Sequence, residues 1–109
     1  MFRAVYEVVL RGFSEELECL SRLYNALTLR GTCIGSQTMF ICSNRNNTVI
    51  KVTPHSTRLA QDVQLYSVAQ PLTVAIVVEG SSAVDIIDAA SVIYSTVKSC
   101  GLSIKLLSD

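Results

Sequence analysis

The sequence predicts a single α+β domain in which two helices cover one face of a mostly antiparallel sheet of four to six strands. Residues 72–107 read as an apolar β-branched run, a segment with helical spacing and a second β-rich run, and a weaker copy of this order fills the first third of the chain. A chain of 109 residues makes one domain and can bury a core without metal or disulfides.

The N-terminal unit begins with a β-rich run at residues 6–10, which Gly12 interrupts. Ser14 is a favourable N-cap residue, and acidic residues follow it in the first turn of the expected helix. The expected helix ends at Gly31, and its apolar stripe consists of Leu17, Leu20, Leu23, Tyr24 and Leu27.

The middle of the chain predicts a β-hairpin with strands at residues 38–43 and 48–53. The asparagine-rich segment 44–47 between them suits a four-residue loop, because asparagine tolerates left-handed backbone angles. Residues 32–37 are expected to be a bulged extension of the first hairpin strand, and residues 63–68 form either a short edge strand or a loop.

The C-terminal unit opens with a central strand at residues 72–79, because this run is apolar almost throughout and rich in β-branched residues. Ser82 and Asp85 have the spacing of a capping box at a helix start. Gly101 fits a left-handed C-terminal cap, and residues 102–107 read as a half-buried strand. Two strand–helix–strand units in one chain predict the ferredoxin-like split β-α-β sandwich.

The composition favours self-association. Half of the residues are apolar and only 17% are charged, which is rich for a small monomer, so we expect a homodimer. No run approaches the roughly 18 apolar residues of a membrane span, and Glu7 within the first apolar run argues against a signal peptide. A cytoplasmic location is the expectation, without contact with a membrane.

The four cysteines, Cys19, Cys33, Cys42 and Cys100, include no Cys-x-x-Cys pair, and His55 is the single histidine. A zinc site normally needs close pairs of ligands, so we expect neither metal nor another cofactor. Buried free thiols are the favoured interpretation, with disulfides as the alternative in a hyperthermophile.

The charges are unevenly distributed, although the net charge is zero. No carboxylate occurs between Cys19 and Gln61, a stretch that holds several basic residues. Arginine and lysine bind phosphates and asparagine can read adenine, so this stretch predicts a nucleic-acid surface as an alternative function. Its candidate residues are Arg22, Arg30, Asn44, Arg45, Asn46, Lys51 and Arg58.

Two strand-to-helix turns and one polar loop are candidate anion sites for a small-molecule-sensing domain. The candidates are Gly12 and Ser14 at the first turn, Gly80, Ser81 and Ser82 at the second, and His55 in the loop. Ordinary helix capping is the favoured explanation of the serines, because no Walker or Gly-x-Gly-x-x-Gly pattern accompanies them.

No catalytic constellation can be read from the spacing of the nucleophiles, the carboxylates and His55. The leading hypothesis is therefore a non-enzymatic binding or assembly module that acts as a homodimer through a face or an edge of its sheet. Nucleic-acid binding and small-molecule sensing remain the alternatives, and a protein partner is a further expectation.

Overall fold

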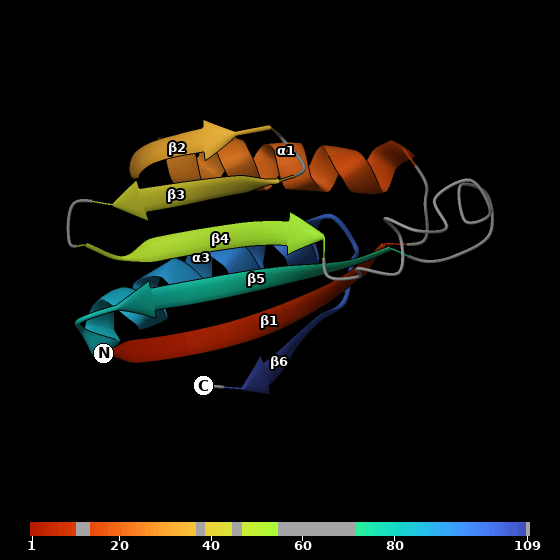
Figure 1. Cartoon of the computed structure of the whole chain (residues 1–109). Coiled ribbons are helices and arrows are strands. Elements are labelled where there is room, and N and C mark those ends of the chain that lie inside the picture. The colour runs from red at the N-terminus through yellow and green to blue at the C-terminus, as the bar shows by residue number, and fades with distance from the viewer. Residues whose placement is uncertain (11–13, 37–38, 45–46, 55–71, 109) are drawn as a thin grey trace.

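The computed structural model describes residues 1–10, 14–36, 39–44, 47–54 and 72–108 of the chain. One sheet contains all six strands of this part, in the order β2-β3-β4-β5-β1-β6 (Figure 1). The elements are β1 (Phe2–Leu10), α1 (Ser14–Thr28), β2 (Gly31–Gly35), β3 (Phe40–Asn44), β4 (Val49–Pro54), β5 (Leu72–Gly80), α3 (Ala83–Ser99) and β6 (Ile104–Ser108).

Every pair of neighbouring strands in the sheet is antiparallel. Strands β5 and β6 both pair with β1, so they run parallel to each other with β1 between them, and α3 connects them. Both helices lie behind the sheet in Figure 1, and they pack against each other. The strands therefore have one face under the helices and one face without helical cover in the described chain.

The predicted α+β class, the antiparallel sheet and the two helices on one face are confirmed. The six-stranded order by itself does not establish the ferredoxin-like topology. The expectation that residues 32–37 extend the first hairpin strand is wrong, because the chain reverses after Gly35 and β2 is a separate strand that pairs antiparallel with β3. The segment 63–68 lies outside the described residues.

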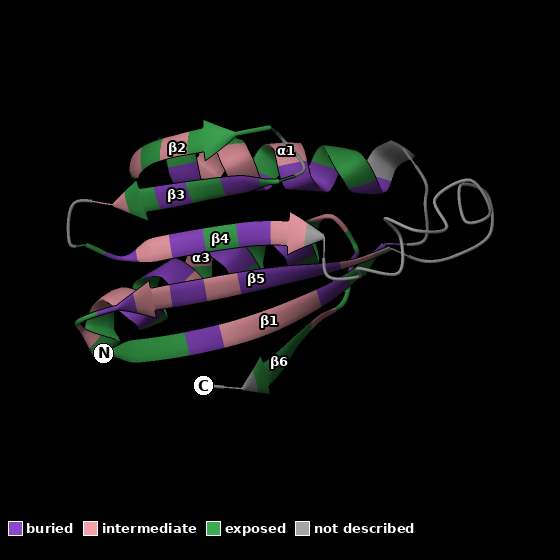
Figure 2. Ribbon diagram, in the orientation of Figure 1, coloured by how far each residue is buried: buried purple, intermediate pink, exposed green. Residues whose placement is uncertain are grey.

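Figure 2 shows buried and more exposed residues alternating along β3 and β4, as expected of strands with one face against the helices, so the core lies between the sheet and the helices. Val8, Val74 and Ile76 are fully buried on the central strands. Phe40 on β3 is buried as well, and its ring makes an edge-to-face contact with Tyr24 of α1 at a centroid distance of 5.1 Å. The aromatic pair fixes α1 over the β2–β3 half of the sheet.

Helix α3 ends in a Schellman motif, as the predicted Gly101 cap requires. Gly101 has φ = 79°, its N–H donates to the Lys98 carbonyl, and the Leu102 N–H donates to the Val97 carbonyl. Leu102 and Val97 are both buried. At the other end Ser82 occupies the predicted N-cap position, but its side chain makes no capping hydrogen bond.

The β3–β4 connection confirms the role of asparagine in this hairpin. Asn47 has φ = 62°, in the left-handed region, and its N–H donates to the Asn44 carbonyl. The Asn44 side-chain oxygen accepts a hydrogen bond from the Thr48 N–H at 3.1 Å. These bonds hold Thr48, which is fully buried, at the start of β4.

The prediction of free thiols is wrong, because the fold pairs all four cysteines. Cys19 of α1 is bonded to Cys100 at the end of α3, and Cys33 of β2 is bonded to its cross-strand partner Cys42 of β3. The Cα atoms are 5.9 Å and 4.0 Å apart, respectively. Sequence spacing did not indicate the first pair, because tertiary packing of the two helices brings residues 81 positions apart together.

Candidate functional site

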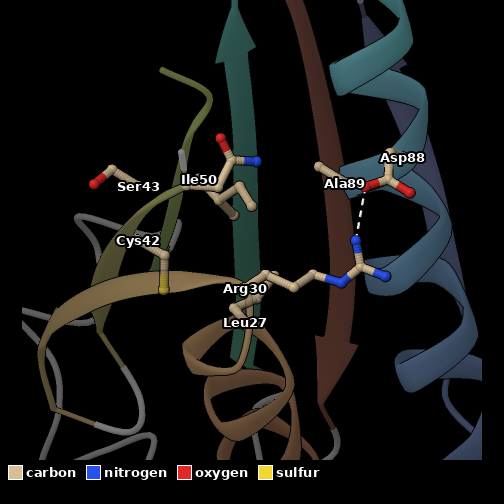
Figure 3. A pocket seen from close by; sticks show the side chains of 8 residues that line it. Leu27, Arg30, Cys42, Ser43, Ile50, Asp88 and Ala89 are labelled. Atoms are coloured by element: carbon tan, nitrogen blue, oxygen red, sulfur yellow. Dashed lines mark hydrogen bonds and ion pairs between the residues drawn. The ribbon is translucent and has the colours of Figure 1, made fainter. Parts of the chain in front are cut away.

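Two concave features adjoin Arg30, which follows α1. The first is a pocket between α1, β3, β4 and α3, lined by Leu27, Arg30, Cys42, Ser43, Asn44, Ile50, Asp88 and Ala89 (Figure 3). The Arg30 guanidinium donates to the Asp88 carboxylate at 2.7 Å across this pocket. Its volume is about 10 Å³, which is about the room that one water molecule needs. It therefore has no space for a substrate.

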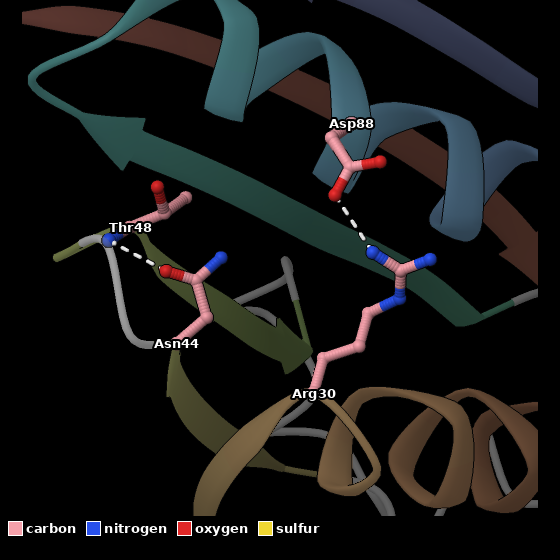
Figure 4. A network of polar contacts seen from close by, with 4 residues as sticks. All are labelled: Arg30, Asn44, Thr48 and Asp88. Carbon is pink, nitrogen blue, oxygen red and sulfur yellow. Dashed lines mark hydrogen bonds and ion pairs between the residues drawn. The ribbon is translucent and has the colours of Figure 1, made fainter.

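The second feature is an open hollow of about 440 Å³ beside the C-terminal end of α1. Its lining is mainly polar and consists of Thr28, Leu29, Arg30, Gly31, Thr32, Ser43 and Asn44. The C-terminal end of a helix carries partial negative charge, which disfavours an anion there. Arg30 compensates this charge and is already paired with Asp88, so the polar contacts of Figure 4 are explained as structural.

The predicted nucleic-acid residues do not gather on one surface in the described chain. Arg30 lies on the helix side of the sheet, where it binds Asp88. Lys51 lies on the opposite face, where its Nζ is 3.7 Å from a carboxylate oxygen of Glu79. Arg22 is exposed on α1. Arg45, Asn46 and Arg58 lie outside the described residues, and Asn44 is engaged in the β3–β4 turn.

The predicted anion residues are partly described. Gly12 and His55 lie outside the described residues, and Ser14 begins α1. Gly80 is buried, and a Cβ at this position would lie 3.0 Å from the Thr48 hydroxyl and 3.3 Å from the Cδ1 atom of Ile86. Close packing therefore explains this glycine. Ser81 is exposed beside it, and Ser82 is the N-cap of α3.

The face of the sheet opposite the helices, which we call the open face, has no helix over it in the described part of the chain (Figure 1). The side chains that alternate with the core positions point to it. Its apolar members are the exposed Val9, Ile34 and Ile41, the half-buried Val5, Val49 and Val77 and the buried Ala75, and its charged members are Arg3, Glu7, Lys51, Glu79 and Lys105. In the sequence, alternation separates the residues of a strand into two sets, one for each face. It does not say which set faces the helices, so the structure was needed to assign these residues to the open face.

An ion-pair row crosses the open face. Glu79 of β5 lies between Arg3 of β1, at 3.6 Å, and Lys51 of β4, at 3.7 Å. The Glu79 side chain is 30% exposed, and both cations are about half exposed. Exposed pairs of this kind contribute little to stability, so the row is of interest mainly as a set of charges available to a partner.

Among the described residues of the chain, no three His, Cys, Asp or Glu side chains gather as metal ligands would. Neither described helix has the length and apolar content that crossing a bilayer requires. No protein-family model matches the sequence, and no curated protein is significantly similar to it. Its surfaces are therefore the basis for a functional proposal.

Proposed function

We propose that this protein is a non-enzymatic assembly module that acts as a homo-oligomer, most simply a dimer, through its sheet. The observation that carries the proposal is the open face, where apolar β-branched side chains stand without helical cover in the described chain. Large apolar surfaces are uncommon on small monomers and are typical of sites of association.

The size of the sheet supports this proposal. Strands β1 and β5 have nine residues each, so they extend for roughly 30 Å. Neighbouring strands are roughly 4.8 Å apart, so a six-stranded sheet is roughly 24 Å across. The other four strands have only five or six residues, so the face is smaller than this rectangle and approaches, from below, the roughly 800 Å² per partner of a standard interface.

The charges of the open face suit a second copy of the chain. A two-fold interface brings the same surface of both copies together, so a self-complementary surface needs charges of both signs. The open face carries the cations Arg3, Lys51 and Lys105 and the anions Glu7 and Glu79. A strongly basic or acidic partner is less well matched by this balance.

We also propose a ferredoxin-like core for the domain. Strands β4, β5, β1 and β6 are adjacent in the sheet, and the parallel pairs β1/β4 and β5/β6 each enclose one antiparallel strand, as split β-α-β units do. Strands β2 and β3 then form a hairpin added beyond β4.

The oligomeric state tests the proposed function directly. Native mass spectrometry and light scattering across a range of protein concentrations should give a mass of about twice 11.9 kDa. A monomer at the highest concentration would remove the proposal. Extra mass on the purified protein would instead identify a bound small molecule or oligonucleotide and favour one of the alternative functions.

The cytoplasmic location remains a prediction. Disulfides persist in oxidising compartments and are rare in the cytosol outside hyperthermophiles. Trapping thiols at the moment of cell lysis and counting the modified cysteines by mass will test it. Four modified cysteines fit a reducing cytosol, whereas two intact disulfides point to an oxidising compartment or a hyperthermophilic source.

A further inference from the structure

The two edges of the sheet differ in how they resist pairing with another strand. Exposed edges are usually protected by charged residues, proline or β-bulges. Strand β6 carries the exposed Lys105, and its pairing with β1 has a register irregularity. Strand β2, with the sequence Gly-Thr-Cys-Ile-Gly, carries no charge and no proline. It is therefore the unprotected edge of the described sheet.

The hydrogen-bond pattern of the β2–β3 hairpin determines which backbone groups of β2 point outward. The Ser36 N–H donates to the Met39 carbonyl at 3.0 Å, which makes these two residues a hydrogen-bonded pair. Hydrogen-bonded and non-hydrogen-bonded pairs alternate in antiparallel strands. Thr32 and Ile34 therefore direct their backbone groups toward β3, whereas Gly31 and Cys33 direct theirs toward the free edge.

Exposed apolar side chains lie beside this edge, as they do beside the β6 edge, where Leu106 is 57% and Leu107 41% exposed. Ile34 of β2 is 70% exposed, and its cross-strand partner Ile41 is 43% exposed. Met39, just before β3, is 54% exposed, and Leu29, just before β2, is 89% exposed. The edge thus combines free backbone groups with apolar surface, the two components that strand addition uses.

We propose that β2 pairs antiparallel with β2 of a second copy of this chain, about a two-fold axis at Cys33, so that the two sheets become one. This inference rests on the proposed homo-oligomeric function and places its contact at the β2 edge of the sheet instead of on the open face. The axis makes Cys33 a hydrogen-bonded pair with its counterpart and places Gly31 opposite Gly35 of the second copy. Thr32 then lies opposite Ile34 of the second copy on the open face, a favourable β-branched pair.

The charge pattern favours this edge and a second copy of the chain. No described residue of β2 is charged, so the two-fold axis opposes no like charges. The same pairing at β6 would bring two Lys105 side chains close together. The Cys33–Cys42 disulfide holds β2 against β3, so the edge is pre-formed before it meets its partner.

Two matched substitutions on the edge strands test the contact. Ile34→Lys should weaken the dimer at least tenfold in Kd, because it removes apolar surface from the contact and charges the edge. Leu106→Lys is the control, since Leu106 is 57% exposed on the opposite edge strand. Analytical ultracentrifugation of the oxidised protein should give Leu106→Lys the same dimer Kd as the wild type. Circular dichroism will verify that both variants fold.

Amide hydrogen exchange tests the pairing itself. The Cys33 N–H should exchange rapidly at protein concentrations where the monomer dominates and become protected where the dimer dominates. The Thr32 N–H should be protected throughout, because it faces β3. A dimer with an unprotected Cys33 amide, or one that Ile34→Lys leaves intact, would overturn the β2 pairing and leave the proposed function standing. A wild-type monomer would remove both.

Discussion

At the scale of single residues, Thr48 is the most unusual buried group. Its hydroxyl oxygen is fully buried and has no hydrogen-bond partner among the described residues. A buried hydroxyl without a partner costs about 1–3 kcal/mol. We predict that Thr48→Val raises the free energy of unfolding by about 1 kcal/mol, as measured by guanidinium denaturation, because valine has nearly the same shape without the hydroxyl.

The matched control is Thr48→Ser, which keeps the hydroxyl and removes the methyl group. This variant should be less stable than the wild type, because it loses packing without relieving the polar group. A loss of stability in Thr48→Val of 1 kcal/mol or more would contradict the prediction and would mean that the hydroxyl has a partner in solution. Both variants keep the backbone N–H that donates to Asn44.

The Arg30–Asp88 pair shows the limit of sequence reasoning at this scale. From the sequence, Arg30 was a candidate for contact with nucleic acid, and no partner could be predicted for Asp88. The fold instead joins these residues, 58 positions apart, by a 2.7 Å hydrogen bond. No local pattern encodes such a contact, because it depends on how α1 and α3 lie across the sheet.

We predict a small energy for this pair, because both side chains are about half exposed. A double-mutant cycle with Arg30→Ala and Asp88→Ala should give a coupling free energy below about 1 kcal/mol. The coupling should decrease further when urea denaturation is repeated at high salt. A coupling above about 2 kcal/mol, unaffected by salt, would show that the pair is a structural anchor.

At the scale of elements, the two disulfides should differ in their contribution to stability. The Cys19–Cys100 bond closes a loop of 81 residues and the Cys33–Cys42 bond one of 9. Chain entropy then gives about 4.5 kcal/mol for the first and about 2.6 kcal/mol for the second. We predict that Cys19→Ala/Cys100→Ala loses about 2 kcal/mol more than Cys33→Ala/Cys42→Ala in guanidinium denaturation.

Each double variant serves as the control for the other, because both remove one disulfide and two sulfur atoms. Adding a reducing agent should bring the wild type below either variant in stability. Equal losses, or no effect of reduction on the wild type, would contradict the assignment of these two bonds. Intact masses before and after reduction will count the bonds independently.

Most elements could be predicted because their signals are local. Alternating or continuous apolar runs identified the strands, and the 3.6-residue stripe identified both helices. Gly101 and the asparagine turn were predicted from backbone preferences that depend on one residue. The cysteine pairs could not be predicted, because Cys33 and Cys42 meet through strand register and Cys19 and Cys100 through helix packing.

At the scale of the whole molecule, the sequence predicted the layers but not the position of each strand. The two predicted strand–helix–strand units suggested equivalent places in the sheet for the strands that follow the two helices, yet β2 and β6 lie at opposite edges of the sheet. The reason is that the strand after α1 forms a hairpin extension, whereas the strand after α3 pairs directly with β1. The unprotected β2 edge is therefore a property of the assembled sheet.

For the intact molecule, we predict that Tm rises with protein concentration. A dimer that dissociates on unfolding gains RT ln 10, about 1.4 kcal/mol per dimer, for each tenfold rise in protein concentration. For a chain of 109 residues this should raise Tm by roughly 3–5 °C in calorimetry of the oxidised wild type. Ile34→Lys should unfold at nearly the same temperature at every concentration, because its monomer is the folded unit.

The Leu106→Lys variant should follow the wild type in this experiment, since its substitution lies on the edge that Lys105 already protects. A concentration-independent Tm for the wild type would contradict self-association. An unchanged concentration dependence in Ile34→Lys would place the contact elsewhere on the sheet, and the open face around Val77 would be the next surface to test. The ion-pair row of Glu79 would then be expected to make the association sensitive to salt, which β2 pairing is not.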